Sequence, residues 1–333
     1  MAGGNPMSRY ARQTCLPEVG EPGQVALEAA HVLVIGAGGL GAPALQYLVG
    51  AGVGRLTLVD GDTVALTNLH RQTLFREDDI GRPKVEAAAD TLRRLNTDCT
   101  IDTVAAPLDP VNAPGLVARA TLVLDCADSF AVSYILSDTC LAAGVPLISA
   151  SVLGVAGYAG GFCGTAPSLR AVFPDLPDRA ATCATAGVMG PVVGMIGAAQ
   201  AQMALACLTG QTPSPLGQVL TFDMQGYRSS SFRFDAAPEP AADLRFIAAS
   251  QITARDFVVE LRPPDEAPRP VFPHARRLRL EDIKSGSGLA PPDGRRAVFA
   301  CRSGLRAWQA ATHLRQTWSG EIALVAAGDP IST

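Results

Sequence analysis

This sequence lacks the paired cysteines that indicate a disulfide framework. Its eight cysteines are scattered over 333 residues, and no two of them form a C-x-x-C pair. Residues 1–6 also lack the apolar core of a secretory signal peptide. We therefore expect reduced thiols and a cytoplasmic location.

A strong charge of either sign is also missing. The chain has 27 Lys and Arg against 31 Asp and Glu, a formal net charge of -4, and the basic cluster at 276–279 is short. Nucleic acid is therefore not expected as the main partner. Hydrophobic residues make up 48% of the chain, which is ample core material for two domains.

One stretch without charge, residues 187–208, resembles a membrane span in hydropathy. It includes Gln200, Gln202 and several glycines, and Gly190-Pro191 interrupts it near its start. These features favour a buried helix over a transmembrane one, so no membrane association is expected.

A nucleotide-binding pattern lies between Val32 and Lys84. An apolar run at 32–35 leads into GAGGLG at 36–41 and a helix-like segment, and Asp60 ends a second strand about 20 residues later. Small residues let backbone N–H groups approach phosphate at a helix N-terminus, and the acid can accept hydrogen bonds from ribose hydroxyls. Taken alone, this fingerprint favours a nicotinamide dehydrogenase.

Two cations follow Asp60 at positions where hydride transfer has no evident use for them. Arg71 lies in NLHRQ at 68–72, and Lys84 ends GRPK at 81–84. Cleavage of a triphosphate needs cations that neutralise charge developing on phosphoryl oxygens. The pair therefore favours ATP, although either residue alone is more often a solvated surface charge.

Apolar strand-like segments alternate with helix-like segments through the first 150 residues. We expect strands at 32–35, 56–59, 100–105, 121–125 and 146–150, and helices at 42–52, 83–96, 111–119 and 131–143. This alternation predicts an α/β, Rossmann-like, doubly wound and mostly parallel sheet. Segments at 219–223 and 229–234 suggest added antiparallel strands. Two prolines, at 238 and 240, then predict a linker, with a smaller second domain beginning near Phe246.

The second domain carries a cysteine between a strand-like and a helix-like segment. Cys301 follows residues 296–300 and precedes residues 307–314. Backbone N–H groups and the positive end of the helix favour a sulfur anion there, and Arg302 and Arg306 add positive charge. A lone cysteine is more often inert and buried, so Cys301 is a candidate nucleophile that needs further support.

Seven ordered motifs carry a family resemblance over residues 8 to 235. They are RYxRQ at 9–13, GAGGLG at 36–41, DGD at 60–62, NLxRQ at 68–72, GxPK at 81–84, DCxD at 125–128 and TCxxAGV at 182–188. Together they resemble the bacterial E1-like adenylyltransferases, the family that includes MoeB and ThiF. The setting of Cys301 looks like a rhodanese domain, in which this cysteine carries a persulfide. Glu260 and Leu261 stand where that family's upstream segment has Asp and Val.

The resemblance implies ATP-dependent adenylylation of the C-terminal Gly-Gly carboxylate of a ubiquitin-like sulfur carrier protein, MoaD-like or ThiS-like. It implies ATP and Mg²⁺ as cofactors, a homodimer, and a cysteine desulfurase or other sulfur donor as a further partner. The implied division is an adenylyltransferase domain at 8–235, a linker at 236–250 and a short or divergent rhodanese-like α/β domain at 251–333. A persulfide on Cys301 would convert the acyl-adenylate towards a thiocarboxylate.

The resemblance also assigns residues. In relatives Arg12 reaches the triphosphate of the partner subunit, Asp128 binds Mg²⁺, and the use of Cys183 as a nucleophile varies. The candidate catalytic residues are Arg12, Arg71, Lys84, Asp128, Cys183 and Cys301. The candidate nucleotide-binding residues are Gly36, Gly38, Gly39, Gly41, Asp60, Asp62, Thr67, Asn68, Leu69, His70, Arg71, Gln72, Lys84, Asp128 and Ser129, the last of which replaces an Asn of many relatives.

Members of the family often hold a structural zinc between two C-x-x-C pairs. This chain has Ser168 and Ala171 at the first pair and no cysteine between Cys207 and Cys301. Zinc needs soft thiolate or imidazole ligands at tetrahedral spacing, so we predict no zinc site.

Three alternatives remain at this point. They are a nicotinamide oxidoreductase, a tRNA-modifying dehydratase of the same superfamily that uses ATP, and a non-catalytic scaffold for a ubiquitin-like protein. The joint presence of Arg12, Arg71, Lys84 and Asp128 disfavours the scaffold. The pathway, whether molybdopterin, thiamin, another metabolite or tRNA thiolation, is not specified by the sequence.

Overall fold

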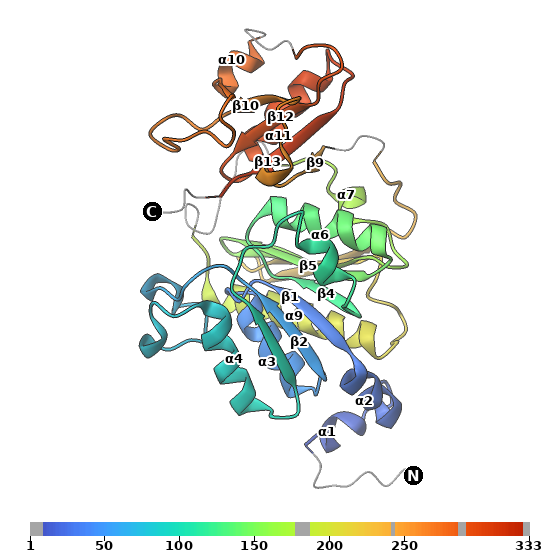
Figure 1. Cartoon of the computed structure of the whole chain (residues 1–333). Coiled ribbons are helices and arrows are strands. Elements are labelled where there is room, and N and C mark those ends of the chain that lie inside the picture. Colours follow the sequence, from blue (N-terminus) through green and yellow to red (C-terminus); the bar gives the residue numbers. More distant parts are fainter. Residues whose placement is uncertain (1–8, 177–186, 241–243, 286–290, 329–333) are drawn as a thin grey trace.

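The computed structural model describes residues 9–176, 187–240, 244–285 and 291–328 (Figure 1). Its first sheet has eight strands in the order β3-β2-β1-β4-β5-β6-β7-β8. The strands are β1 His31–Ile35, β2 Arg55–Val59, β3 Thr100–Val104, β4 Leu122–Asp125, β5 Pro146–Leu153, β6 Ala156–Cys163, β7 Gln218–Asp223 and β8 Arg228–Arg233. The first five are parallel and the last three are added antiparallel, which confirms the predicted fold class.

Helices cover both faces of this sheet. The helices of this part of the chain are α1 Ala11–Thr14, α2 Gly20–Ala29, α3 Gly41–Gly50, α4 Lys84–Leu95, α5 Ala113–Val117, α6 Phe130–Ala143, α7 Leu169–Val172 and α9 Gly190–Leu208, with short 3-10 turns η1 Leu66–Asn68 and η2 Glu77–Asp79. In β1, Val32 and Val34 pack with α3, α4 and α9, whereas Leu33 and Ile35 pack on the opposite side with α5 and α6. Burial on both faces explains why β1 is a continuous apolar run.

Strand β6 was not expected from the sequence. Its residues, AGYAGGFC, include three glycines and two alanines, which have low strand propensity. It pairs along its whole length with β5, and its second half is buried. A Cβ on Gly157 or Gly161 would overlap the carbonyl oxygen of Ser151 or Pro215, so close packing explains these glycines.

The second sheet has five parallel strands in the order β11-β10-β12-β13-β9. Its elements are β9 Arg245–Phe246, η3 Ala249–Gln251, β10 Phe257–Glu260, β11 Arg276–Arg277, α10 Leu280–Lys284, β12 Ala297–Cys301, α11 Leu305–Arg315 and β13 Ile322–Ala326. Strand β9 and the first two residues of η3 fall inside the stretch 236–250 that was expected to be a linker. The division at residues 235 and 250 therefore stays a prediction.

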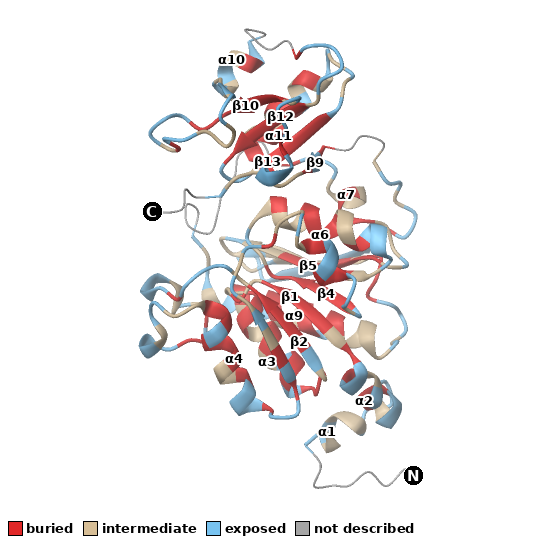
Figure 2. Cartoon of the chain, viewed as in Figure 1, coloured by how far each residue is buried: buried red, intermediate tan, exposed pale blue. Residues whose placement is uncertain are grey.

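The two sheets are joined through α6. This helix contacts β9, and one buried cluster contains apolar side chains from α6, β9, β12 and α11 together. The inner strands β1, β4, β10 and β12 are buried, as Figure 2 shows in red, whereas β8 at the end of the first sheet is exposed. The second sheet therefore packs on the first part of the chain through an apolar contact (Figure 1).

Helix α9 is the one described helix that is long and apolar enough to cross a membrane by length and composition. It packs against α3, β5 and β6, and 44% of its most apolar window is buried within the molecule. Its fully buried Gln200 bonds to other parts of the chain, as described below. These contacts are those of a core helix.

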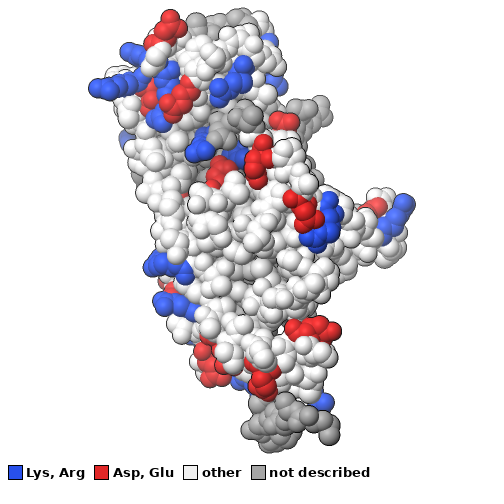
Figure 3. All heavy atoms as spheres, turned by 90° about the vertical axis from the view of Figure 1, so that its right-hand side faces the viewer, with Lys and Arg blue, Asp and Glu red and all other residues white. Residues whose placement is uncertain are grey.

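Charged side chains are spread over the face drawn in Figure 3. Basic and acidic residues are interspersed there, and neutral residues separate them. No broad patch of one sign covers the described part of this face. The distribution agrees with the small net charge of -4.

Candidate active site

The predicted motifs meet at the carboxyl edge of the first sheet. The order of strands reverses between β1 and β4, which is where open α/β sheets bind ligands. Gly36 follows β1, Asp60 follows β2 and Asp128 lies just beyond β4. A Cβ on Gly36 would lie 2.7 Å from the carbonyl oxygen of Cys126, so the loops after β1 and β4 touch.

Steric packing explains most of the glycines in the loop. Gly36 has φ +97°, a conformation that side chains rarely adopt. A Cβ on Gly39 would lie 2.6 Å from Val193 of α9, and one on Gly41 would overlap the carbonyl oxygen of Gly36. Gly38 differs, because its Cβ would make only an ordinary contact, at 3.6 Å from a side-chain nitrogen.

Asp60 fastens the end of β2 to the glycine loop. Its Oδ2 accepts a hydrogen bond from the N–H of Ala37, and its Oδ1 accepts one from the N–H of Asp62, each at 2.8 Å. Burial raises the pKa of this carboxyl, and nearby Lys84 and the two N–H donors oppose that shift. Each carboxylate oxygen can accept another bond, so ribose hydroxyls can still donate to Asp60.

Lys84 joins the same cluster from the start of α4. It is 6% exposed, and its Nζ lies 2.8 Å from the Oδ2 of Asp62, whose side chain is largely exposed. Compact and buried, the ammonium group sits beside Asp60 and Asp62. Its charge is therefore close to the site where the acid would hold a ribose.

The segment 66–72 lies over the glycine loop. The Cγ and Cδ of Arg71 are 3.5 Å from the position of a Cβ on Gly39. The Nη1 of Arg71 donates to the carbonyl oxygen of Thr67 at 3.1 Å and to the Nε2 of His70 at 2.8 Å.

Two further residues stabilise this segment. Asn68 closes the 3-10 turn by accepting the N–H of Ala65 at 3.0 Å. Leu69 packs against the core. The structure thus places the aliphatic part of the Arg71 side chain over the loop that is predicted to bind phosphate.

Gln72 provides a sign that a ligand belongs here. Its side chain is 3% exposed, and its Oε1 is buried with no partner among the described residues. Its amide nitrogen faces Gly38. A buried acceptor without a donor costs about 1–3 kcal/mol, so such a group fits a site that a bound molecule completes. The residues present therefore fit a nucleotide.

Asp128 is exposed on the loop between β4 and α6, and Ser129 is the N-cap residue of α6. In the described part of the chain, no three His, Cys, Asp or Glu side chains form a metal cluster. Mg²⁺ in nucleotide sites commonly uses one or two carboxylates together with phosphate oxygens and water. A single exposed carboxylate therefore fits a magnesium that arrives with a nucleotide.

Two buried polar residues that the sequence did not assign support this loop. Asp125 is fully buried, accepts the hydroxyl of Ser149 at 2.8 Å and the N–H of Ala127 at 3.2 Å, and burial raises its pKa to about 6. Gln200 of α9 donates to the carbonyl oxygens of Asp125 at 2.6 Å and Ile148 at 3.1 Å. The available signal was a polar residue within an apolar helix, which indicates buried hydrogen bonds.

Arg12 is not brought to this site within the chain. Near it, Gln13 donates to the carbonyl oxygen of Ala51 at 3.0 Å, just past the end of α3. The glycine loop lies at the other end of this ten-residue helix, about 15 Å away. Cys183 lies outside the described residues.

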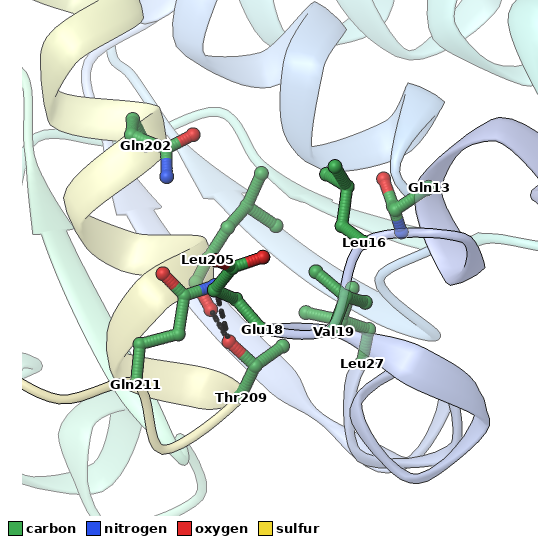
Figure 4. A pocket seen from close by; sticks show the side chains of 9 residues that line it. All are labelled: Gln13, Leu16, Glu18, Val19, Leu27, Gln202, Leu205, Thr209 and Gln211. Carbon is green, nitrogen blue, oxygen red and sulfur yellow. Dashed lines mark hydrogen bonds between the residues drawn. The ribbon is translucent and has the colours of Figure 1, made fainter.

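A hollow of about 250 Å³ lies between α1, α2 and the last turn of α9 (Figure 4). It is lined by Gln13, Leu16, Glu18, Val19, Leu27, Gln202, Leu205, Thr209 and Gln211. None of the predicted catalytic residues is among them. This hollow is therefore separate from the glycine-loop site.

Cys301 is the last residue of β12, directly before the turn to α11, close to where the sequence placed it. Its Sγ accepts hydrogen bonds from the N–H of Gly304 at 3.1 Å and of Ala307 at 3.4 Å. The residue is 0% exposed, and burial raises the pKa of its thiol although those N–H groups and Arg306 oppose the shift. The backbone N–H groups and Arg306 thus favour the sulfur anion, as expected, but desolvation outweighs them and the net shift of the pKa is upward.

The segment around Glu260, which precedes Cys301 in the sequence, contains a buried ion pair. Glu260 is 0% exposed and receives the Nε and Nη2 of Arg262 at 2.9 and 2.8 Å. Burial opposes its ionisation, yet Arg262 and the N–H of Val271 lower its pKa. Next to it, the carbonyl oxygen of Leu261 accepts Arg306 at 3.1 Å. Glutamate thus keeps a carboxylate where the family pattern has Asp.

Hydrogen bonds connect the two segments that hold a structural zinc in many relatives. Glu239 accepts the N–H of Ser168 at 2.7 Å and its hydroxyl at 2.5 Å. Ser168 also caps α7 by accepting the N–H of Ala171 at 3.3 Å. These bonds tie the chain after β8 to α7, and the absence of zinc stays a prediction.

Comparison with known proteins agrees with this site. The chain matches the ThiF family over residues 10–243. It is 44% identical over 210 residues to the adenylyltransferase and sulfurtransferase UBA4 of Yarrowia lipolytica, covering 61% of this chain and 52% of that protein. It is 39% identical over 219 residues to the SAMP-activating enzyme E1 of Haloferax volcanii, covering 65% and 81%.

Among solved structures, E. coli MccB has the same fold in its matching part. Its TM-score is 0.64 at 22% identity, and the match covers 72% of this chain and 73% of MccB. The chain spans about half the length of the UBA4 relative, with 52% covered. Both the ordered motifs and the match over residues 10–243 lead to one conclusion: this chain belongs to the ThiF family.

Proposed function

We propose that this protein adenylylates the C-terminal Gly-Gly carboxylate of a ubiquitin-like sulfur carrier protein. The observation that carries the proposal is the glycine loop with Arg71 above it, Lys84 beside Asp60, and an acceptor on Gln72 that has no partner among the described residues. The names of the UBA4 and SAMP-activating relatives, which cover the same part of the chain, support it. The site has more cationic groups than hydride transfer needs.

The reaction is a substitution at phosphorus. A carboxylate oxygen of the carrier attacks the α-phosphorus of ATP, the bond to the bridging oxygen breaks, and pyrophosphate leaves. Backbone N–H groups of the loop bind phosphate, and Asp60 accepts ribose hydroxyls. Lys84 exchanges its exposed partner Asp62 for phosphate oxygens, and Arg71 and Asn68 stabilise charge on the transferring group.

Magnesium neutralises phosphate charge in such reactions. Asp128 would hold it, because its carboxylate is exposed at the edge where the triphosphate would lie. Asp125 and Ser149 keep the start of the Asp128 loop in place through their hydrogen bond of 2.8 Å. Ser129 replaces Asn with another hydrogen-bonding oxygen.

The active form in this proposal is a homodimer. Arg12 lies at the far end of α3 from the glycine loop of its own chain. It can therefore contact triphosphate only in a partner subunit, as the family resemblance implies. Measurement of the molecular size tests for a dimer. Mixing Arg12→Ala subunits with Asp128→Ala subunits tests the shared site: each variant alone is inactive, and the mixture is active only if Arg12 of one chain acts in the site of the other.

In this proposal, the acyl-adenylate reacts with sulfur carried on Cys301. A persulfide on Cys301 would attack the acyl carbon and expel AMP, which forms an acyl disulfide. A dithiol reductant then supplies two electrons, becomes a disulfide, and releases the carrier thiocarboxylate and the Cys301 thiol. A cysteine desulfurase or another sulfur donor would supply the persulfide.

ATP/pyrophosphate exchange that depends on the carrier tests the adenylylation step. We expect Arg71→Ala or Asp128→Ala to reduce the exchange rate by about 10² to 10³, since each removes an electrostatic group. Arg55→Ala is the matched control, because Arg55 pairs with Asp102 on the surface and both are well exposed. Exchange at the wild-type rate in both site variants would refute the proposal, and so would exchange without any carrier.

A further inference from the structure

The loop that carries Cys301 lies against the helix that begins next to Asp128. A Cβ on Gly304 would lie 3.4 Å from the Cβ of Ala131 and 2.6 Å from the ring of Phe246. Ala131 is the second residue of α6, three positions after Asp128. The outer side of the Cys301 loop is therefore covered by α6 and by β9.

One side chain joins the elements that meet at this contact. Arg170 of α7 is 4% exposed, and its Nε and Nη2 donate to the two carboxylate oxygens of Asp138 on α6 at 2.6 and 2.9 Å. Its Nη2 also donates to the carbonyl oxygen of Leu244, just before β9, at 3.3 Å. The guanidinium therefore ties the chain that enters the second sheet to α6.

The same guanidinium also lies over two aromatic rings. Its carbon is 4.3 Å from the centre of the Tyr134 ring on α6 and 5.6 Å from that of Trp308 on α11. These rings contact each other with centres 5.6 Å apart. A planar cation that is paired, hydrogen-bonded and placed over aromatic rings at once holds its neighbours in one geometry.

Helix α7 has a second attachment two residues earlier. Ser168, its N-cap, bonds twice to Glu239. Glu239 and Leu244 both lie in the chain that leads from β8 to β9. This short helix therefore holds that segment at two points and leaves little freedom between the two sheets while Arg170 is in place.

We infer that Arg170 is a positioning residue, which docks the Cys301-bearing part of the chain on α6 and thereby encloses the thiol. Cys301 is 0% exposed, and its Sγ already receives two backbone N–H groups. A sulfur donor cannot reach a sulfur atom with no exposed surface. Loading of Cys301 therefore requires release of the contact that Arg170 holds.

Thiol alkylation tests this inference without ATP or carrier, so its result does not depend on the proposed adenylylation. The reduced protein of 333 residues is treated with iodoacetamide, and the label on each cysteine is followed by peptide mass spectrometry. In the wild type, exposed Cys15 is expected to react fast, and buried Cys140 and Cys301 are expected to react slowly. Arg170→Ala is expected to accelerate labelling of Cys301 about tenfold or more, since the buried bonds that oppose local opening are lost.

Two controls separate release from unfolding. Cys140 lies on α6 and is 0% exposed, so it must stay unreactive in Arg170→Ala. Arg233→Ala removes a similar bidentate Arg–Asp pair, Arg233 with Asp235, from the surface and should label as the wild type does. If Arg170→Ala does not fold, Ala131→Leu, which inserts a larger side chain against Gly304, replaces it.

A second readout distinguishes positioning from general weakening. Polysulfide loads Cys301 when the thiolate attacks a terminal sulfur and displaces a polysulfide one atom shorter. Loading, measured as a mass gain of one sulfur, should be faster in Arg170→Ala, while carrier-dependent pyrophosphate exchange stays near the wild-type rate. Slow labelling of Cys301 in the folded variant, or wild-type labelling of Cys301 as fast as Cys15, would overturn the inference.

Discussion

Two strand-loop-helix turns in this chain use backbone N–H groups in different ways. In the first, residues 36–41 connect β1 to α3, and nearby Gln72 keeps a buried acceptor without a partner in the described structure. In the second, residues 301–304 connect β12 to α11, and the N–H groups of Gly304 and Ala307 point at the chain's own sulfur.

The difference teaches that the turn itself does not decide its function. Beside the glycine loop, the buried acceptor of Gln72 has no partner among the described residues, and in the proposed function a ligand completes this site. The Cys301 loop contains its own reacting atom, which needs only access. In the proposed function, the first site therefore depends on binding of a ligand and the second on exposure of its sulfur.

The largest expected effect separates the two sites chemically. Cys301→Ser removes the sulfur that would carry a persulfide, so thiocarboxylate formation should fall to background. Pyrophosphate exchange should not change, because Cys301 is not part of the nucleotide site. Mass spectrometry of the carrier and the exchange assay measure both, with Cys15→Ser as the exposed-cysteine control. Loss of exchange in Cys301→Ser would break the comparison.

The next prediction concerns the carboxylate beneath the Asp128 loop. The pKa of Asp125 is raised to about 6 in the folded protein, from 3.8. A raised pKa means that folding favours the protonated form, so its contribution to stability is present below pH 4 and is lost as the pH rises through 6. The loss amounts to about 3 kcal/mol between these limits.

Asp125→Asn removes this titration. The free energy of unfolding of the wild type minus that of the variant should therefore fall as the pH rises from 4 to 7, measured by urea unfolding at each pH. Asp102→Asn, on an exposed surface carboxylate, is the control. A difference that does not depend on pH would show that Asp125 titrates in the folded protein as it does in the unfolded chain.

A smaller effect distinguishes two glycines of the same loop. Gly41→Ala forces a Cβ into the carbonyl oxygen of Gly36, which should destabilise the fold by about 1–3 kcal/mol and weaken ATP binding. Gly38→Ala is the matched control, since its Cβ would meet its nearest neighbour only at 3.6 Å. Thermal unfolding and binding of a fluorescent ATP analogue test the pair; equal stability of the two variants would contradict the packing explanation.

The smallest effect is expected on the surface. Arg55 and Asp102 form an ion pair with side chains 55% and 43% exposed. Arg55→Ala should change the free energy of unfolding by at most about 1 kcal/mol and leave exchange unchanged. Urea unfolding measures it. A larger loss of stability would show that the charge of Arg55 on β2 stabilises the fold, although it lies outside both sites.

Local patterns were sufficient for most of the first sheet. The apolar run of β1, the glycine loop and Asp60 lie where their spacing predicted, because both faces of a parallel strand are buried and phosphate loops need small residues. Strand β6 was missed because its glycines fit neighbouring chains, which no local propensity reports. The sequence showed Gln200 only as a polar residue in an apolar segment. Its hydrogen bonds to Asp125 and Ile148 join residues that are far apart in the sequence, so only the folded structure reveals them.

By itself the sequence determined most strands and helices of the first sheet apart from β6, the glycine loop, the two cations that follow it, and a cysteine at the junction of a strand and a helix. These features are local, since they depend on periodicity, on small residues and on motif spacing. Only the tertiary structure decided that Cys301 is enclosed, that Arg12 lies away from its own site, and that Arg170 joins α6, α7 and α11. Burial and long-range contacts decide these outcomes, because the pKa and accessibility of a group depend on whatever the whole fold places around it.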